Sequence, residues 1–339
     1  MLLIIFSSVI LLSFILTIFI EKIFIKTNIF IDTPSDRKVH ANTVPTAGGL
    51  AIIFSFFIYI ALLSKFYVID TYSFLVLFLA ITPIIIIGLI DDKNEVNVYI
   101  RLIVQFFSAL LIIYYFQINN NIFDSYNNQN SMILIISSLL LSVWLMNLFN
   151  FMDGIDAYAA SECIFVSFSS ALIAYVNNTD NLMFLYLTGI GLASFGFILR
   201  NWYPAKIFMG DTGSVTIGCI FAFFIFYSGS ESVLSIYTWL ILLSIFISDA
   251  TYTLIVRIVT KKNVSKPHLT HAFHIISRKT TQFFTVKTMI LINLLWVFPL
   301  AFMSNLLSNY HIIITFIAYL PLLIYLIKIG AGLENDTIK

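Results

Sequence analysis

Four oxygen-bearing side chains recur at every third position within the stretch NLFNFMDGIDAYAASE. They are Asn147, Asn150, Asp153 and Asp156. Residues three apart on a helix share a face, and a 3₁₀ stretch would keep such a stripe aligned. An ordinary polar helix end at a membrane interface is the alternative, but four such groups in register exceed what that role needs. The stripe therefore predicts a functional site.

Three further aspartates occupy positions where a helix would begin or end. Asp91 and Asp92 are adjacent in GLIDDKNEV, at the end of a long apolar run. Adjacent carboxylates repel one another unless a cation is near, and a helix C-terminus disfavours anions, so helix capping accounts for at most one of them. Asp211 follows Gly210 in FMGDTGSVTIG, before another apolar run. It could cap the next helix, whose first N–H groups would also favour an anionic ligand, and the two roles are compatible.

Two basic segments complete the set of polar groups. DTPSDRKVHANTVPTAGGLAI (32–52) contains Lys38 and His40. KKNVSKPHLTHAFHIISRK (261–279) contains Lys266, His268, His271, His274 and Arg278. Either segment could be a solvated loop that fixes membrane topology, and the histidines could form a zinc site. However, no cysteine joins the histidines and their surroundings are cationic, so the second segment favours binding of a phosphorylated substrate.

Together these groups are typical of phosphoryl transfer. Carboxylate and amide oxygens suit a hard cation, most simply Mg²⁺, which prefers oxygen ligands and substrate phosphates. Basic residues and histidines suit the remaining charge of a diphosphate. Phosphoryl transfer needs such positioning, a metal that neutralises charge and a group that activates the nucleophile.

These residues are embedded in a chain that is far too apolar for a water-soluble domain. Of 339 residues, 60% are hydrophobic and 10% are charged, and the mean hydropathy is +0.98, whereas a soluble domain is about a quarter charged. We therefore expect an all-α, polytopic membrane protein forming one integral-membrane domain over residues 1–339. The first apolar run lacks a basic region and a cleavage site, so it is expected to be a retained helix. Cys163 and Cys219 are expected to be buried small side chains.

Eleven transmembrane helices are predicted by length and hydropathy. Their approximate bounds are 2–24, 48–63, 72–90, 99–116, 131–149, 157–176, 182–199, 213–229, 234–256, 286–304 and 311–329. Of the 18 Lys and Arg residues, all but Lys65 fall in loops or flanks on one side. Because basic loops stay in the cytoplasm, we expect the N-terminus outside and the C-terminus in the cytoplasm. All the polar segments described above would then lie at the cytoplasmic face, where one substrate could be soluble and the other a lipid.

The motifs resemble those of the polyprenyl-phosphate N-acetylhexosamine-1-phosphate transferases, the MraY/WecA group of glycosyltransferase family 4. The matching pieces are RKVHANTVPTAGGLAI, GLIDDK, NLFNFMDGIDA, IFMGDTGSVTIG and the histidine loop, in family order over roughly positions 32 to 280. The resemblance implies a Mg²⁺-dependent, multi-pass enzyme of the bacterial inner membrane with a cytoplasmic site. It would transfer a sugar 1-phosphate from a UDP-N-acetylsugar to undecaprenyl phosphate and release UMP. A homodimer is plausible by this likeness alone, and no nucleic acid is expected as a partner.

Roles for individual residues also follow from the resemblance. The expected catalytic residues are Asp91, Asp92, Asp153, Asp156, His268 and His271. The expected substrate-binding residues are Asn147, Asn150, Lys38, His40, Gly210, Lys266 and Arg278, and the expected metal ligands are Asp211 and Asn150. Asp91 is the better candidate of its pair for orienting or deprotonating the lipid phosphate. Glu162, Asp249 and His274 receive no assigned role.

The histidine loop departs from the family pattern. Many relatives carry His-x-His-His there, whereas this chain has PHLTHAFH. That sequence is more similar to the WbpL/WbcO-like branch, which starts O-antigen or capsular repeats in lipopolysaccharide synthesis with 6-deoxy-N-acetylsugars. The alternative within the family is an MraY-like phospho-MurNAc-pentapeptide transferase. A secondary transporter of an anionic solute is disfavoured because no repeated halves are visible and the polar residues crowd one face.

Overall fold

The protein is almost wholly helical. The computed structural model describes residues 1–32, 43–120, 128–177, 182–263 and 268–333. The helices are α1 (Leu2–Thr27), α2 (Gly49–Leu63), α3 (Thr71–Lys93), α4 (Val98–Asn120), α5 (Asn128–Met152), α6 (Tyr158–Asn177), α7 (Met183–Asn201), α8 (Gly210–Ser230), α9 (Ile236–Leu242), α10 (Ser244–Val259), α11 (Ala272–Lys279), α12 (Gln282–Ile292), α13 (Phe298–Leu306) and α14 (His311–Ile329). A π-helical turn, Asn293–Val297, joins α12 to α13, and a 3₁₀ turn, Ser308–Tyr310, precedes α14.

The helix lengths confirm a polytopic membrane protein. Among the described residues, nine helical stretches are long and apolar enough to cross a bilayer. The predicted span 48–63 corresponds to α2, which is apolar but has only 15 residues. The predicted span 234–256 is interrupted, because α9 and α10 meet at Leu243 with a 75° bend. The two halves have different main neighbours, since α9 packs chiefly on α13 and α14 while α10 packs on α14 and α5.

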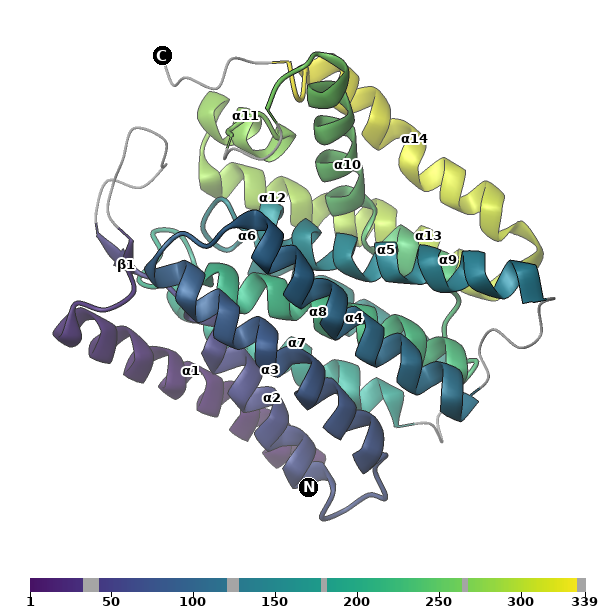
Figure 1. Ribbon diagram of the computed structural model, residues 1–339, viewed down its shortest axis with the longest axis horizontal. Helices are drawn as coiled ribbons and strands as arrows, with labels where there is room; N and C mark the ends of the chain where they lie inside the picture. Colours follow the sequence, from purple (N-terminus) through teal and green to yellow (C-terminus); the bar gives the residue numbers. More distant parts are fainter. Residues whose placement is uncertain (33–42, 121–127, 178–181, 264–267, 334–339) are drawn as a thin grey trace.

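Helix α8 lies at the centre of the bundle and is almost entirely buried. It packs chiefly against α3 and α5, and the same three helices overlap in the middle of Figure 1. Small residues permit this approach: a Cβ on Gly49 of α2 would lie 2.2 Å from the Cα of Gly213, and one on Gly88 of α3 would lie 2.6 Å from the Cα of Thr212. Close packing therefore brings the C-terminal end of α3 against the first turn of α8.

A short β-hairpin leads into α2. Backbone hydrogen bonds join the end of this hairpin to the residues just before α8. β1 (Ile31–Asp32) pairs antiparallel with β2 (Val44–Pro45). The Phe208 N–H donates to the Pro45 carbonyl at 2.8 Å, and the Gly48 N–H donates to the Phe208 carbonyl at 2.9 Å. These backbone bonds fix the entry of α2 beside the entry of α8.

The C-terminal part of the chain forms a separate group of helices in contact with the bundle. Helices α10, α11 and α14 contact one another, and Figure 1 shows them together near the C-terminus in green to yellow. Helix α1, in purple, lies at the opposite side of the view and packs on α7. There the buried Glu21 accepts two hydrogen bonds from Arg200, at 2.6 and 2.9 Å, which offsets the cost of burying its charge.

Candidate active site

Helices α3, α4, α5 and α8 bring their polar residues together at one end of the bundle. Asp211, in the first turn of α8, accepts a hydrogen bond from Asn150 Nδ2 at 2.8 Å and one from Arg101 Nη1 at 2.8 Å. The same Arg101 nitrogen lies 2.5 Å from Asp91 Oδ2. Asp91 and Asp211, which are far apart in sequence, are therefore joined through a single guanidinium group, and Asn150 joins them through Asp211. We call Asp91, Arg101, Asn150 and Asp211 the acidic cluster.

Asp92 has a structural partner that its position in the sequence did not reveal. Its carboxylate accepts hydrogen bonds from the N–H groups of Asp211 and Thr212, at 3.0 and 3.2 Å, and from the Thr212 hydroxyl at 2.6 Å. Thr46 Oγ1 donates to it at 3.3 Å. Asp92 thus caps the N-terminus of α8 and not a terminus of its own helix, where the dipole would be unfavourable.

Gly210 allows the close contact between Asp92 and α8. Its φ is +75°, a conformation that favours glycine. A Cβ at this position would lie 2.5 Å from Thr46 Oγ1 and 2.7 Å from Asp92 Oδ1. The structure therefore gives Gly210 a packing role, while its predicted contact with substrate stays a prediction.

Asp153 and Asp156 lie in the turn between α5 and α6. The stripe seen in the sequence is not one continuous helix, because α5 ends at Met152 and Ala157 has a φ of +62°. Burial raises the pKa of Asp153 well above its usual value, and the negative charges of Asp211 and Asp92 raise it further. The site thus carries more negative charge than Arg101 alone offsets.

Asp156 and Asn147 make contacts directed away from the acidic cluster. The buried Asp156 accepts a hydrogen bond from the Ala205 N–H at 2.9 Å, which ties the α5–α6 turn to the segment before α8. Asn147 Nδ2 donates to Gln105 Oε1 at 2.6 Å and to the Val143 carbonyl at 2.8 Å. Asn150 is the residue of the stripe whose side chain bonds to Asp211, while the Asp153 N–H donates to the Asn150 carbonyl at 3.3 Å.

The histidine loop packs against the same turn. A Cβ on Gly154 would lie 2.7 Å from the His274 ring, so the imidazole occupies the space that a larger residue would fill. Burial lowers the pKa of His274 well below its usual value, and the nearby His271, Arg278 and His268 side chains lower it further. The His268 and His271 rings stack with centroids 4.9 Å apart. Arg278 Nη2 donates to the Leu269 carbonyl at 3.1 Å, so it helps to close this loop.

Three predicted binding residues, Lys38, His40 and Lys266, lie outside the described residues. Arg101, by contrast, is central to the site and was missed by sequence reasoning. The signal for it was available: two adjacent carboxylates need a nearby cation, and Arg101 begins the next predicted span, ten residues after Asp91. The contact of Thr212 with Asp92 was also missed, because it depends on how α3 packs on α8.

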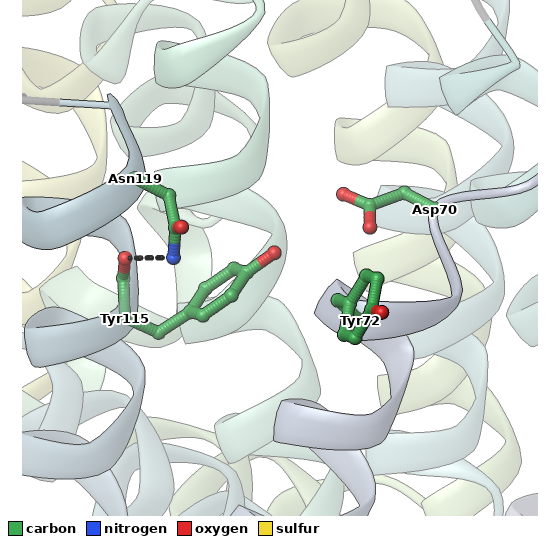
Figure 2. Close-up of a pocket in the computed structure, with 4 residues that line it drawn as sticks. All are labelled: Asp70, Tyr72, Tyr115 and Asn119. Atoms are coloured by element: carbon green, nitrogen blue, oxygen red, sulfur yellow. Dashed lines mark hydrogen bonds between the residues drawn. The ribbon is translucent and has the colours of Figure 1, made fainter.

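Two other polar positions lie apart from the acidic cluster. Glu162, fully buried on α6, accepts a hydrogen bond from Asn293 Nδ2 at 2.6 Å and so connects α6 to the π-helical turn. The pocket in Figure 2, lined by Asp70, Tyr72, Tyr115 and Asn119, lies at the beginning of α3. Asp91 is about 20 residues further along that helix, roughly 30 Å away at 1.5 Å per residue.

The fold is that of a multi-pass membrane protein, and comparison with known proteins shows which enzymes the chain resembles. The glycosyl transferase family 4 model matches residues 74–229. The chain is 28% identical over 266 residues to a probable undecaprenyl-phosphate N-acetylglucosaminyl 1-phosphate transferase of Bacillus subtilis, covering 77% of this chain and 73% of that protein. It is 29% identical over 254 residues to the phospho-N-acetylmuramoyl-pentapeptide-transferase of Prochlorococcus marinus, covering 70% and 68%.

A third relative is similar over a larger share of the chain. The undecaprenyl-phosphate alpha-N-acetylglucosaminyl 1-phosphate transferase of Thermotoga maritima is 25% identical over 286 residues, covering 84% of this chain and 85% of that protein. The chain is thus similar to the MraY/WecA-like membrane phospho-sugar transferases, in its central part by the family model and over most of its length by these relatives. The family resemblance found in the sequence is thus confirmed, whereas the O-antigen branch is not supported by these relatives.

Proposed function

We propose that this protein transfers the 1-phosphate of an N-acetylhexosamine from a UDP-sugar to undecaprenyl phosphate, giving undecaprenyl-diphospho-sugar and UMP. The observation that carries this proposal is the acidic cluster. Arg101 bridges Asp91 and Asp211, and Asn150 donates to Asp211 directly. The ends of α3 and α5, the start of α8 and a basic side chain meet there. A site that binds both a phosphate group and a cation needs such a mixture of charges. The printed names of the relatives supply the substrate classes.

The proposed chemistry is a direct displacement. An oxygen of the lipid phosphate attacks the β-phosphorus of the UDP-sugar, and the bond from that phosphorus to the oxygen bridging to the α-phosphate breaks, so UMP leaves with the bond electrons. In this proposal Asp91 orients the attacking phosphate or accepts its remaining proton. Its second oxygen is held by the Val96 N–H at 2.6 Å, which fixes the carboxylate after α3 ends.

The donor set fits a divalent cation such as Mg²⁺. Among the described residues, no three His, Cys, Asp or Glu side chains already form a metal-binding group. However, the Asp211 carboxylate lies beside the Asn150 amide, and the negative charges of Asp211 and Asp92 add to the effect of burial in raising the pKa of Asp153. When bound, Mg²⁺ would neutralise charge on the diphosphate. The loop of His268 and His271 would contact the rest of that diphosphate, with Arg278 supporting the loop.

Orientation and the identity of the sugar are also proposed. The end of the bundle that holds the acidic cluster also carries Lys93, Arg200 and Lys206, in line with a cytoplasmic site at the inner membrane. The relatives named above are transferases for N-acetylglucosamine or phospho-N-acetylmuramoyl-pentapeptide. We infer an N-acetylhexosamine donor for cell-surface polysaccharide synthesis, and the histidine loop favours including 6-deoxy sugars of O-antigen type among the donors tested.

The test is UMP release from membranes that contain the protein, given Mg²⁺, undecaprenyl phosphate and a panel of UDP-N-acetylsugars. We expect release with one donor and none after EDTA treatment. Asp211→Asn should abolish release while the amount of folded protein stays constant. Asp70→Asn, at the opposite end of α3, is the matched control and should remain active. Release that survives both EDTA and Asp211→Asn would discard the metal assignment, and no release with any donor would discard the reaction.

A further inference from the structure

Helix α10 carries two buried charged residues that lie outside the acidic cluster. Asp249 and Arg257 are about two turns apart, and their exposed fractions are 4% and 1%. Burying a charge is costly unless the group is paired and hydrogen-bonded. The partners of these two side chains therefore indicate what α10 supports, and in both cases the contacts lead to the histidine loop.

Asp249 contacts His271 and the first turn of α11. Its two oxygens accept hydrogen bonds from the N–H groups of Ala272 and Phe273, at 2.9 and 3.1 Å. Oδ1 also lies 3.3 Å from His271 Nδ1. Asp249 thereby caps α11 and orients the imidazole immediately before it. The two contacts place His271 at a fixed position relative to the helix.

This contact also selects a tautomer of His271. An ionised carboxylate only accepts hydrogen bonds, so the proton must be on His271 Nδ1 for the pair to form. The other ring nitrogen, Nε2, is then the one that can contact a ligand. A carboxylate that fixes the tautomer and orientation of an imidazole in this way is a recurring feature of functional histidines.

Arg257 supports His268 indirectly, through Thr270. Its Nη1 donates to Thr270 Oγ1 at 3.3 Å, and its Nη2 donates to the Asn263 carbonyl at 2.7 Å. Thr270 Oγ1 is also 3.0 Å from His268 Nδ1. The Thr270 carbonyl accepts from the Gly332 N–H at 2.9 Å, so the end of α14 holds the same residue from the other side.

The two supported histidines lie together beside the α5–α6 turn. Their rings stack on each other, and the His271 ring stacks on Phe151 with centroids 6.4 Å apart. His274, three residues later, fills the space above Gly154. The loop is thus held by α10 on one side and rests on the segment containing Asp153 on the other.

We propose that Asp249 and Thr270 are positioning residues that hold His271 and His268 in one orientation toward the diphosphate of the nucleotide sugar, with Arg257 fixing Thr270. This inference rests on the proposed function, in which the histidine loop contacts that diphosphate. The proposal gives α10 a role in binding the UDP-sugar, although α10 lies outside the histidine loop.

The kinetic test compares Asp249→Asn and Thr270→Val with wild type and with Thr17→Val. Thr17 is the matched control because it is also fully buried, but its hydroxyl bonds only within α1, to the Ser13 carbonyl at 2.7 Å. Initial rates of UMP release are measured against UDP-N-acetylglucosamine, or the donor that the panel identifies, and against undecaprenyl phosphate. A merely structural role lowers the maximal rate through loss of folded protein and leaves both KM values unchanged.

We expect Asp249→Asn and Thr270→Val to raise KM for the UDP-sugar and to leave KM for undecaprenyl phosphate unchanged. The loss in kcat/KM for the donor should be roughly 10- to 100-fold, the range seen when the hydrogen-bond partner of a metal-bound histidine is removed. Thr17→Val should behave like wild type. If KM for the UDP-sugar is unchanged in both Asp249→Asn and Thr270→Val, the positioning role is overturned.

A second measurement does not depend on the reaction. ¹⁵N NMR of histidine-labelled protein reports the tautomer of each ring, and His271→Gln assigns the signal. We expect the proton on Nδ1 in wild type and a changed signal in Asp249→Asn. A wild-type His271 with an unprotonated Nδ1 would overturn the inference. If wild type releases no UMP with any donor, the proposed function fails, and the tautomer then decides by itself whether Asp249 orients His271.

Discussion

The two ends of α3 both carry aspartates, yet the carboxylates there have different partners. At the N-terminal end, Asp70 accepts a hydrogen bond from the Ser73 N–H of its own helix at 3.1 Å. At the C-terminal end, Asp92 accepts from the first N–H groups of α8, and Asp91 pairs with Arg101 of α4. The first arrangement is local, whereas the second depends on three helices being packed together.

Electrostatics explains why the two ends serve different purposes. A helix N-terminus favours an anion, so Asp70 is stabilised where it stands. Asp91 and Asp92 stand where the dipole of α3 disfavours them, and only the N-terminus of α8 and the guanidinium group of Arg101 compensate. Carboxylates that need partners from other elements can also interact with a cation or a phosphate group, so we assign stability alone to the first end and both stability and chemistry to the second.

The largest effect is expected for Asp92→Ala. The change removes the cap of α8 and leaves the buried N–H groups of Asp211 and Thr212 without their acceptor, at about 1–3 kcal/mol for each unsatisfied group. We expect a clear fall in the thermal unfolding temperature in detergent and no UMP release. Asp92→Asn, which retains one acceptor oxygen, should lie between alanine and wild type. An alanine variant with wild-type stability would show that Asp92 is not the cap.

Arg101→Met should reduce activity strongly with little effect on stability. The guanidinium group is partly exposed and joins Asp91 to Asp211, so its loss leaves the two carboxylates to repel each other. We expect UMP release to fall roughly 100-fold or more, as when one electrostatic contact is removed from an active site. Arg101→Lys, which keeps the charge, should recover part of the rate. Equal rates for the methionine and lysine variants would mean that the charge of this residue is not used.

Sequence reasoning located the residues of this end but not how they are joined. Asp91, Asn150 and Asp211 each occur where an apolar run begins or ends, so alternating loops predicted that they share one membrane face. Which residue bonds to which depends on helix neighbours. The capping of α8 by Asp92 requires the close approach at Gly88, and hydropathy carries no information about it. Asn147 had the spacing of the stripe, but the side chain bonds to Gln105 of α4 instead.

The histidine loop shows the same limit in another form. Its residues were identified from their types, and Asp249 received no assigned role. Its contact with His271 depends on the bend at Leu243, since α10 then contacts α11 and α14. An apolar pattern predicts one helix through that bend, because the two halves together are long and apolar enough to be a single span. Local sequence patterns therefore predicted the helices. The hydrogen bonds between distant helices could be seen only in the structure.

The smallest effect is expected for Asp70→Ala. Removing the cap of α3 should lower the free energy of unfolding by about 0.5–2 kcal/mol, the usual range for an N-cap aspartate. The contact of Ser73 Oγ with the Tyr115 hydroxyl, at 2.9 Å, links α3 to α4 and should survive in part. Because Asp70 lies roughly 30 Å along the helix from Asp91, UMP release per folded molecule should equal that of wild type. A lower rate per folded molecule would show that the pocket in Figure 2 communicates with the acidic cluster, and the assignment of stability and chemistry to opposite ends of α3 would then be wrong.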